Sequence, residues 1–188
     1  MIPRVLLYWT ASLLLFQTAF SQKIIVNGRE SNGKLSWEDY TGKPDKSSPF
    51  YACTANNINY NYDSVEIFGD SVIIKGNQVI LELDPIKSWI NIEMANNKKA
   101  NAELLIHEQG HFNLGILCMN EILTKYKNSI FQKSNFNNLL QTMFSETLSK
   151  YMELGVKYDK ETDNSKNKEQ QLKWNAFFET ELAKKPDN

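Results

Sequence analysis

Histidine and cysteine are scarce in this sequence of 188 residues, which contains two of each. Cys53 and Cys118 lie far apart, neither belongs to a CxxC pair, and no third cysteine is present. These counts exclude a zinc–thiolate finger, which needs several closely spaced thiolates. In an oxidising compartment the two cysteines could form one disulfide, and two buried free thiols are the alternative.

An excess of charge of one sign is also missing, because 21 basic residues stand against 22 acidic ones and the net charge is −1. The lysines are interspersed with acids and asparagines along the chain. A surface that tracks nucleic-acid phosphates would instead cluster Lys and Arg. We therefore expect no nucleic acid among the partners.

Hydrophobic runs are short, and the clearest one lies near the start of the chain. Residues 5–16 are apolar, follow an arginine, and precede Ala19 and Ser21, two small residues of the kind that signal peptidase accepts. This pattern is typical of a secretory signal peptide, and a membrane anchor of ~20 residues is the alternative. The residue directly after Ser21 is not a cysteine, so a lipid anchor is not expected. We predict a signal peptide at 1–21 and a mature domain at 22–188, exported to the periplasm or the extracellular space without stable membrane insertion.

The remaining composition, with 41% hydrophobic and 23% charged residues, is that of a globular protein. In the first half, apolar residues alternate loosely with polar ones, as in half-buried strands. The pair Gly76-Asn77 lies between two such segments and suits a two-residue hairpin turn. We expect an antiparallel sheet with strands at about 23–26, 50–62, 65–68, 72–74 and 79–83.

From about residue 100 the apolar spacing changes to the period of a helix. Three helices are expected, at about 100–127, 136–154 and 168–183, and the first should be largely buried because apolar side chains cover much of its circumference. The polar stretch 158–167 is expected to connect the last two helices. Strands followed by helices predict an α+β fold in one domain.

The segment His107-Glu108-Gln109-Gly110-His111 has the HExxH spacing and contains both histidines of the chain. Residues four apart on a helix share one face, so both imidazoles can reach one Zn²⁺ at ~2.0–2.1 Å. In this arrangement Glu108 acts as the general base for a zinc-bound water and passes the proton to the leaving amine. The alternative is that two helical histidines serve only in packing or at the surface.

A catalytic zinc usually has three protein ligands, and the third cannot be a histidine here. Cys118 would lie about 10 Å along the helix from His111, and Glu121 is further still. Residues 158–164 offer three carboxylates in a loop that can pack back on the first helix. A solvated run of charges is the alternative for that segment.

Several residues besides the motif resemble a known family. They are Leu35-x-Trp37-x-Asp39-Tyr40-x-Gly42, Ala52-x-Thr54, Ser88-Trp89, Tyr158-Asp159-x-Glu161-Thr162 and Gln171-x-x-Trp174. In this order the chain, from about Leu35 to Leu182, looks like the bacterial domain of unknown function 922, which is described as a predicted secreted zinc-dependent protease. The resemblance implies a zincin-like fold with HExxH on the first long helix, a zinc cofactor, and a peptide or protein substrate.

The resemblance also bears on the rest of the site. The family has a histidine two residues after the Glu-Thr pair, where this chain has Asn164, so any role of that histidine in metal binding or catalysis is lost here. Asp159 is the preferred third ligand and Glu161 the second choice. Tyr158 could donate its phenol to the developing oxyanion, with aromatic packing as the alternative. Core packing is expected for Trp37, Trp89 and Trp174.

The sequence thus supports an exported zinc metallopeptidase that uses Glu108 as its general base. An extended substrate is expected to add to an edge strand from the 50–83 region. Two alternatives stay open. One is a non-catalytic exported domain with a structural zinc or none, and the other is a zinc hydrolase of a different amide, such as one in the cell wall.

Overall fold

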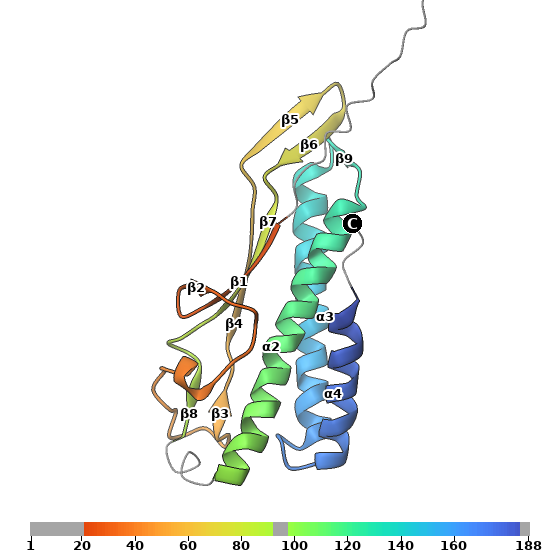
Figure 1. Cartoon of the computed structure of the whole chain (residues 1–188). Helices are drawn as coiled ribbons and strands as arrows, with labels where there is room; N and C mark the ends of the chain where they lie inside the picture. Colours follow the sequence, from red (N-terminus) through yellow and green to blue (C-terminus); the bar gives the residue numbers. More distant parts are fainter. Residues whose placement is uncertain (1–20, 92–97, 185–188) are drawn as a thin grey trace, which may run out of the picture.

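The computed structural model describes residues 21–91 and 98–184. The predicted signal peptide lies, apart from Ser21, outside the described residues. Among the described helices, none is both long enough and apolar enough to cross a bilayer. The described chain forms strands first and three helices afterwards, which confirms the predicted α+β class (Figure 1).

Nine strands form three small sheets in the described part of the chain. The largest has the order β2-β1-β7-β4, the second pairs β3 with β8, and the third has the order β5-β6-β9. A short 3-10 helix, η1, covers Trp37–Asp39. The strands are β1 (Ser21–Val26), β2 (Arg29–Glu30), β3 (Ala52–Cys53), β4 (Asn56–Asn61), β5 (Ser64–Phe68), β6 (Ser71–Lys75), β7 (Gln78–Leu83), β8 (Trp89–Ile90) and β9 (Phe131–Gln132).

The prediction of a purely antiparallel sheet is wrong at β1. This strand runs parallel to β7, while β4 pairs with the other side of β7 in the antiparallel sense. Residues 21–25 pair with residues 78–82, far along the chain, so the connection has room to cross over, as a parallel pair requires. The sheet is therefore mixed, and β4 forms its edge.

The predicted hairpin turn at Gly76-Asn77 is also wrong, because β6 and β7 do not pair with each other. The two-residue loop is Gly69-Asp70, which joins β5 to β6 and has a φ of 61° at its glycine. At Gly76 the chain bends between β6 and β7 with a φ of 65°. A Cβ there would meet the Asp63 carboxylate at 2.0 Å. Gly76 thus marks a kink in a long two-stranded arm rather than its tip.

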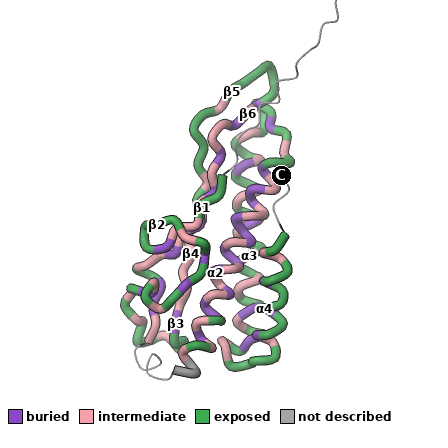
Figure 2. Tube along the Cα trace, in the orientation of Figure 1, coloured by how far each residue is buried: buried purple, intermediate pink, exposed green. Residues whose placement is uncertain are grey.

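The three helices lie side by side, with α2 between the main sheet on one side and α3 and α4 on the other (Figure 1). They are α2 (Lys98–Lys127), α3 (Phe136–Thr162) and α4 (Lys168–Ala183). The central position of α2 explains its apolar circumference, and its buried residues follow its whole length (Figure 2). The predicted bounds of α2 and α4 agree closely with the structure.

The helix α3 is longer than predicted, because residues 155–162 continue it instead of forming a loop. Lys160 of the polar run is exposed on its outer face, whereas Tyr158 and Thr162, four residues apart, are buried on its inner face. The helix ends where Asp163 adopts the left-handed conformation, with a φ of 47°.

Two apolar clusters form the core. The larger lies between the main sheet, α2 and the first half of α3, and the smaller joins α2, the end of α3 and α4 through Leu114, Leu117, Tyr158, Trp174 and Phe178. Trp89 and Trp174 are buried as predicted, and Trp37 packs partly against the larger cluster. Both cysteines are free thiols, so no disulfide joins them; Cys118 is buried as the alternative expected, whereas Cys53 is only partly buried.

Candidate metal centre

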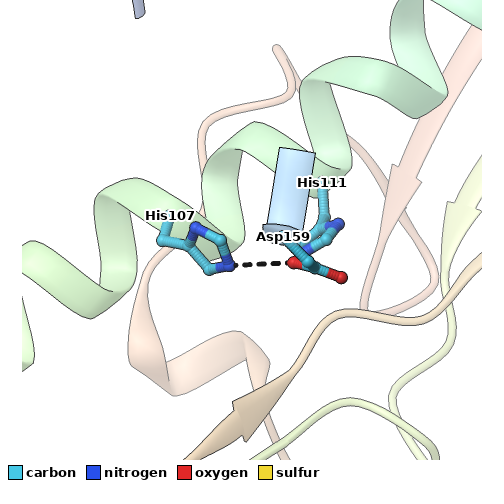
Figure 3. Close-up of side chains that lie close together, drawn as sticks. All are labelled: His107, His111 and Asp159. Atoms are coloured by element: carbon cyan, nitrogen blue, oxygen red, sulfur yellow. Dashed lines mark hydrogen bonds and ion pairs between the residues drawn. The ribbon is translucent and has the colours of Figure 1, made fainter. Parts of the chain in front are cut away.

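His107, His111 and Asp159 converge on one point between α2 and α3 (Figure 3). Oδ1 of Asp159 lies 3.2 Å from Nε2 of His107 and 2.8 Å from Nε2 of His111. The three ligand atoms all lie within 4.8 Å of one another. The structure therefore brings together the two histidines of the motif and the preferred third ligand, and the group could hold a metal ion.

The donor set fits zinc. Two imidazole nitrogens and one carboxylate oxygen are ligands that zinc takes in catalytic sites, with a fourth position open. Ligands at about 2.0 Å in a tetrahedron are about 3.3 Å apart, close to the separations found between Asp159 and the two histidines. At such separations each ring nitrogen can either donate a hydrogen bond to the carboxylate or bind a metal ion together with it.

Hydrogen bonds on the far side of the His107 ring fix its tautomer. Nδ1 lies 3.2 Å from Oε1 of Gln171 and 3.3 Å from Oγ1 of Thr162. The Thr162 hydroxyl donates to the carbonyl of Tyr158, so its oxygen accepts from His107, as does Oε1 of Gln171. Nδ1 therefore carries a hydrogen, and Nε2, the ring atom that can bind a metal ion, points at Asp159. This is the outer arrangement that orients metal-binding histidines.

The charges of the three groups stabilise one another. Partial burial opposes ionisation of Asp159, but hydrogen bonds from His107 and His111 outweigh it and hold the pKa of this carboxyl well below its usual range. Burial also opposes protonation of His111. The hydrogen bond to Asp159 and the negative charges of Glu108 and Asp159 prevail and raise the pKa of His111. In the absence of a metal ion a proton therefore tends to occupy its place.

Glu108 lies beside this group and is only 3% exposed. Its Oε2 accepts a hydrogen bond of 2.6 Å from the Thr54 hydroxyl, whose oxygen is 2.8 Å from the Tyr40 hydroxyl. Because Thr54 donates its proton to Glu108, Tyr40 donates to Thr54. No group in residues 21–91 and 98–184 is found bonded to Oε1 of Glu108, so this oxygen can accept a proton.

A cavity of about 360 Å³ opens onto the group, and His107, Glu108, His111 and Asp159 all line it. Its outer wall carries Phe50 and Tyr51, both about half exposed. Asn164, Lys166 and Cys53 line it too. Burial, with the negative charges of Glu108 and Asp159, raises the pKa of the Cys53 thiol and keeps it protonated. The cavity is the space in which a substrate could meet the site.

The geometry corrects the role predicted for Tyr158. Its side chain is fully buried, its ring stacks on His107 at 4.6 Å between centroids, and its hydroxyl donates to the carbonyl of His107 at 3.0 Å. The phenol thus lies behind the histidine, away from the cavity, and cannot reach an oxyanion. Tyr158 is a packing residue that supports His107, which was the alternative.

The second choice for the third ligand also lies elsewhere. Oε2 of Glu161 accepts a hydrogen bond of 2.9 Å from the indole of Trp174. Two residues apart on a helix, Asp159 and Glu161 point in nearly opposite directions. Glu161 therefore helps to dock α4 and takes no part in the group.

Sequence reasoning gave no role to Thr54, Thr162 and Gln171, although each bonds a site residue. All three are uncharged and none has a spacing that marks a ligand. Their presence among the residues that resemble the family was the only signal. Comparisons with protein-family models, with curated proteins and with solved structures gave no match for this chain. A functional assignment therefore depends on the chemistry of the site itself.

Proposed function

We propose that this protein is an exported, zincin-like zinc metallopeptidase. The observation that carries the proposal is the location of Glu108, a buried carboxylate, in the same cavity as His107, His111 and Asp159. When bound there, a zinc ion would lower the pKa of a water molecule and polarise the scissile carbonyl. The resemblance of the sequence to a family of predicted secreted zinc proteases supports the same proposal.

Glu108 takes the role of general base. The hydroxyl of Thr54 holds Oε2 in place, which leaves Oε1 to accept a proton from the attacking water. The same oxygen then returns the proton to the leaving amine. Thr54 and Tyr40 position the carboxylate, since their hydroxyls are engaged with each other and with Glu108.

The edge strand β4 supports a peptide as the substrate. It has β7 on one side only in the described sheet, and residues 56–59 line a cavity that also includes His111. An extended peptide can add to such an edge by main-chain hydrogen bonds and so bring one of its bonds to the site. Because main-chain hydrogen bonds hold such a peptide, its binding does not require charged residues on the protein surface.

One variant tests the proposal. Glu108→Gln should keep the zinc and lose roughly a hundredfold or more of the turnover of denatured casein. Glu103→Gln is the matched control, because it makes the same change on the same helix at a side chain that pairs with Lys168 outside the cavity. Equal turnover by wild type and Glu108→Gln would overturn the proposed reaction.

Asn164 favours a second candidate, a non-catalytic domain with a structural metal. This residue occupies the position of the histidine in the resembling family, and it lines the cavity beside Asp159. If that histidine is needed for the reaction, the cavity here keeps the metal and lacks the activity. Zinc bound by the wild type with no turnover of casein, together with turnover that appears after Asn164→His, would favour this candidate.

A further inference from the structure

A second cavity adjoins the site on its other side. It has a volume of about 590 Å³ and shares Thr54 and His111 with the cavity that contains Glu108. Its walls come from the edge strand β4, from α2 and from residues 148–155 in the middle of α3. A peptide that lies along β4 with one bond at the metal centre would place a neighbouring side chain in this cavity.

Among the residues that the structure describes, no Asp, Glu, Lys or Arg lines this cavity, although these four types make up 23% of the chain. The apolar walls are Ile58, Leu114, Leu148 and Met152, and three asparagines lie along β4. When His111 binds the metal, a charged side chain in this space would lose hydration and find no ion-pair partner among the other lining residues. An apolar side chain would gain by leaving water.

Gly155 keeps the cavity open on the side of α3. Glycine in a helix interior is less favourable than alanine by about 1 kcal/mol, so a reason for it is expected. Packing supplies none, because a Cβ at Gly155 would meet only Leu114 Cδ1 at 4.0 Å. At Gly110 and Gly115, by contrast, a Cβ would meet Tyr158 at 2.2 Å and Leu81 at 2.9 Å. The one consequence of having no side chain at Gly155 is therefore that space is left in the cavity.

We propose that this cavity is the specificity pocket of the peptidase and takes a large, uncharged, apolar side chain next to the bond that is cleaved. Gly155 determines how large that side chain can be. The inference depends on the proposed function, because it assigns to the cavity a residue of the peptide that the metal centre would cleave.

The test measures binding, so it does not depend on turnover. Three dipeptide hydroxamates that differ in one side chain, isobutyl, hydrogen or carboxymethyl, are titrated into the zinc-loaded protein by calorimetry. The isobutyl compound should bind roughly 10- to 100-fold more tightly than the hydrogen compound, since it buries a leucine-sized side chain. The carboxymethyl compound should bind no better than the hydrogen compound.

The variant Gly155→Leu should remove the advantage of the isobutyl compound and leave the affinity of the hydrogen compound unchanged. Val156→Leu is the control, because Val156 is 70% exposed and does not line the cavity. Gly155→Ala should give a smaller loss, and urea unfolding checks that each variant is folded.

Two kinds of failure can be told apart. Equal affinities for the isobutyl and hydrogen compounds, or an isobutyl advantage that survives Gly155→Leu, would overturn the specificity pocket alone. Failure of all three hydroxamates to bind would overturn the metal centre and the proposed function with it.

Discussion

Replacement of Gly110 by alanine should destabilise the protein, although alanine is the better helix former by about 1 kcal/mol. The new Cβ would lie 2.2 Å from the Tyr158 hydroxyl and 2.5 Å from the ring carbon that bears it. Tyr158 would have to move by more than an ångström. It would then lose its hydrogen bonds to His107 and Gln171.

The magnitude follows from these contacts. Overpacking of a core costs about 1–3 kcal/mol, and a buried hydrogen-bonding group left unpaired costs about 1–3 kcal/mol. After the gain in helix propensity, a net loss of roughly 1–5 kcal/mol in the free energy of unfolding remains. Zinc affinity should fall as well, because Tyr158 stacks on His107.

The assay is urea unfolding of the zinc-free protein, with Gly155→Ala as the matched variant. Both changes add one methyl group in the middle of a helix, but only Gly155 has space for it. Gly155→Ala should therefore raise the stability by up to about 1 kcal/mol. A Gly110→Ala protein as stable as the wild type, with unchanged zinc affinity, would refute the packing of α3 against the motif.

Three further predictions concern residues around the metal centre. Thr54→Val should lower turnover roughly tenfold without loss of zinc, because Glu108 loses its hydroxyl donor, whereas Thr54→Ser should retain activity. Equal rates for both variants would contradict this role. Gln171→Leu should weaken zinc binding by roughly 10- to 100-fold in a chelator competition, because His107 loses a partner of Nδ1. Zinc affinity should fall as the pH drops, since protons compete for the imidazole nitrogens. The raised pKa of His111 in the zinc-free protein places the start of that fall above its ordinary value of 6.5. Affinity that stays constant from pH 8 to pH 5 would exclude histidine ligands.

The sequence was informative where the interactions are local. Spacing alone placed His107 and His111 on one face of a helix, and the change from alternation to the helical period marked the α+β order. The histidine count showed that the third ligand could not be a histidine, and the distance along the helix set Cys118 aside. These inferences needed no knowledge of which elements pack together.

The choice between Asp159 and Glu161 depends on the direction in which each side chain points around the axis of α3. In a loop either carboxylate can turn toward the metal, and residues 158–164 were expected to form a loop. Because the helix continues to Thr162, Asp159 faces His107 and Glu161 faces Trp174. The helix continues because Tyr158 and Thr162 are buried on its inner face. This burial depends on packing against other elements, and the polar composition of residues 158–164 does not reveal it.

The sequence also does not predict which strands pair with each other. Gly69-Asp70 and Gly76-Asn77 both have the residues of a tight turn, and only the pairing of β5 with β6 shows which one joins two strands that pair with each other. The parallel partnership of β1 with β7 joins residues more than fifty positions apart. Alternation of apolar residues predicts a strand and gives no information about its neighbour or direction.

The zinc content of the purified protein tests the central claim most directly. Wild type, Asp159→Ala and Glu161→Ala are loaded with zinc, dialysed against a weak chelator and measured by atomic emission. We predict about one zinc ion per chain for the wild type and for Glu161→Ala, and loss of most of it for Asp159→Ala. A wild type without zinc, or an Asp159→Ala variant that retains it, would contradict the metal centre of His107, His111 and Asp159.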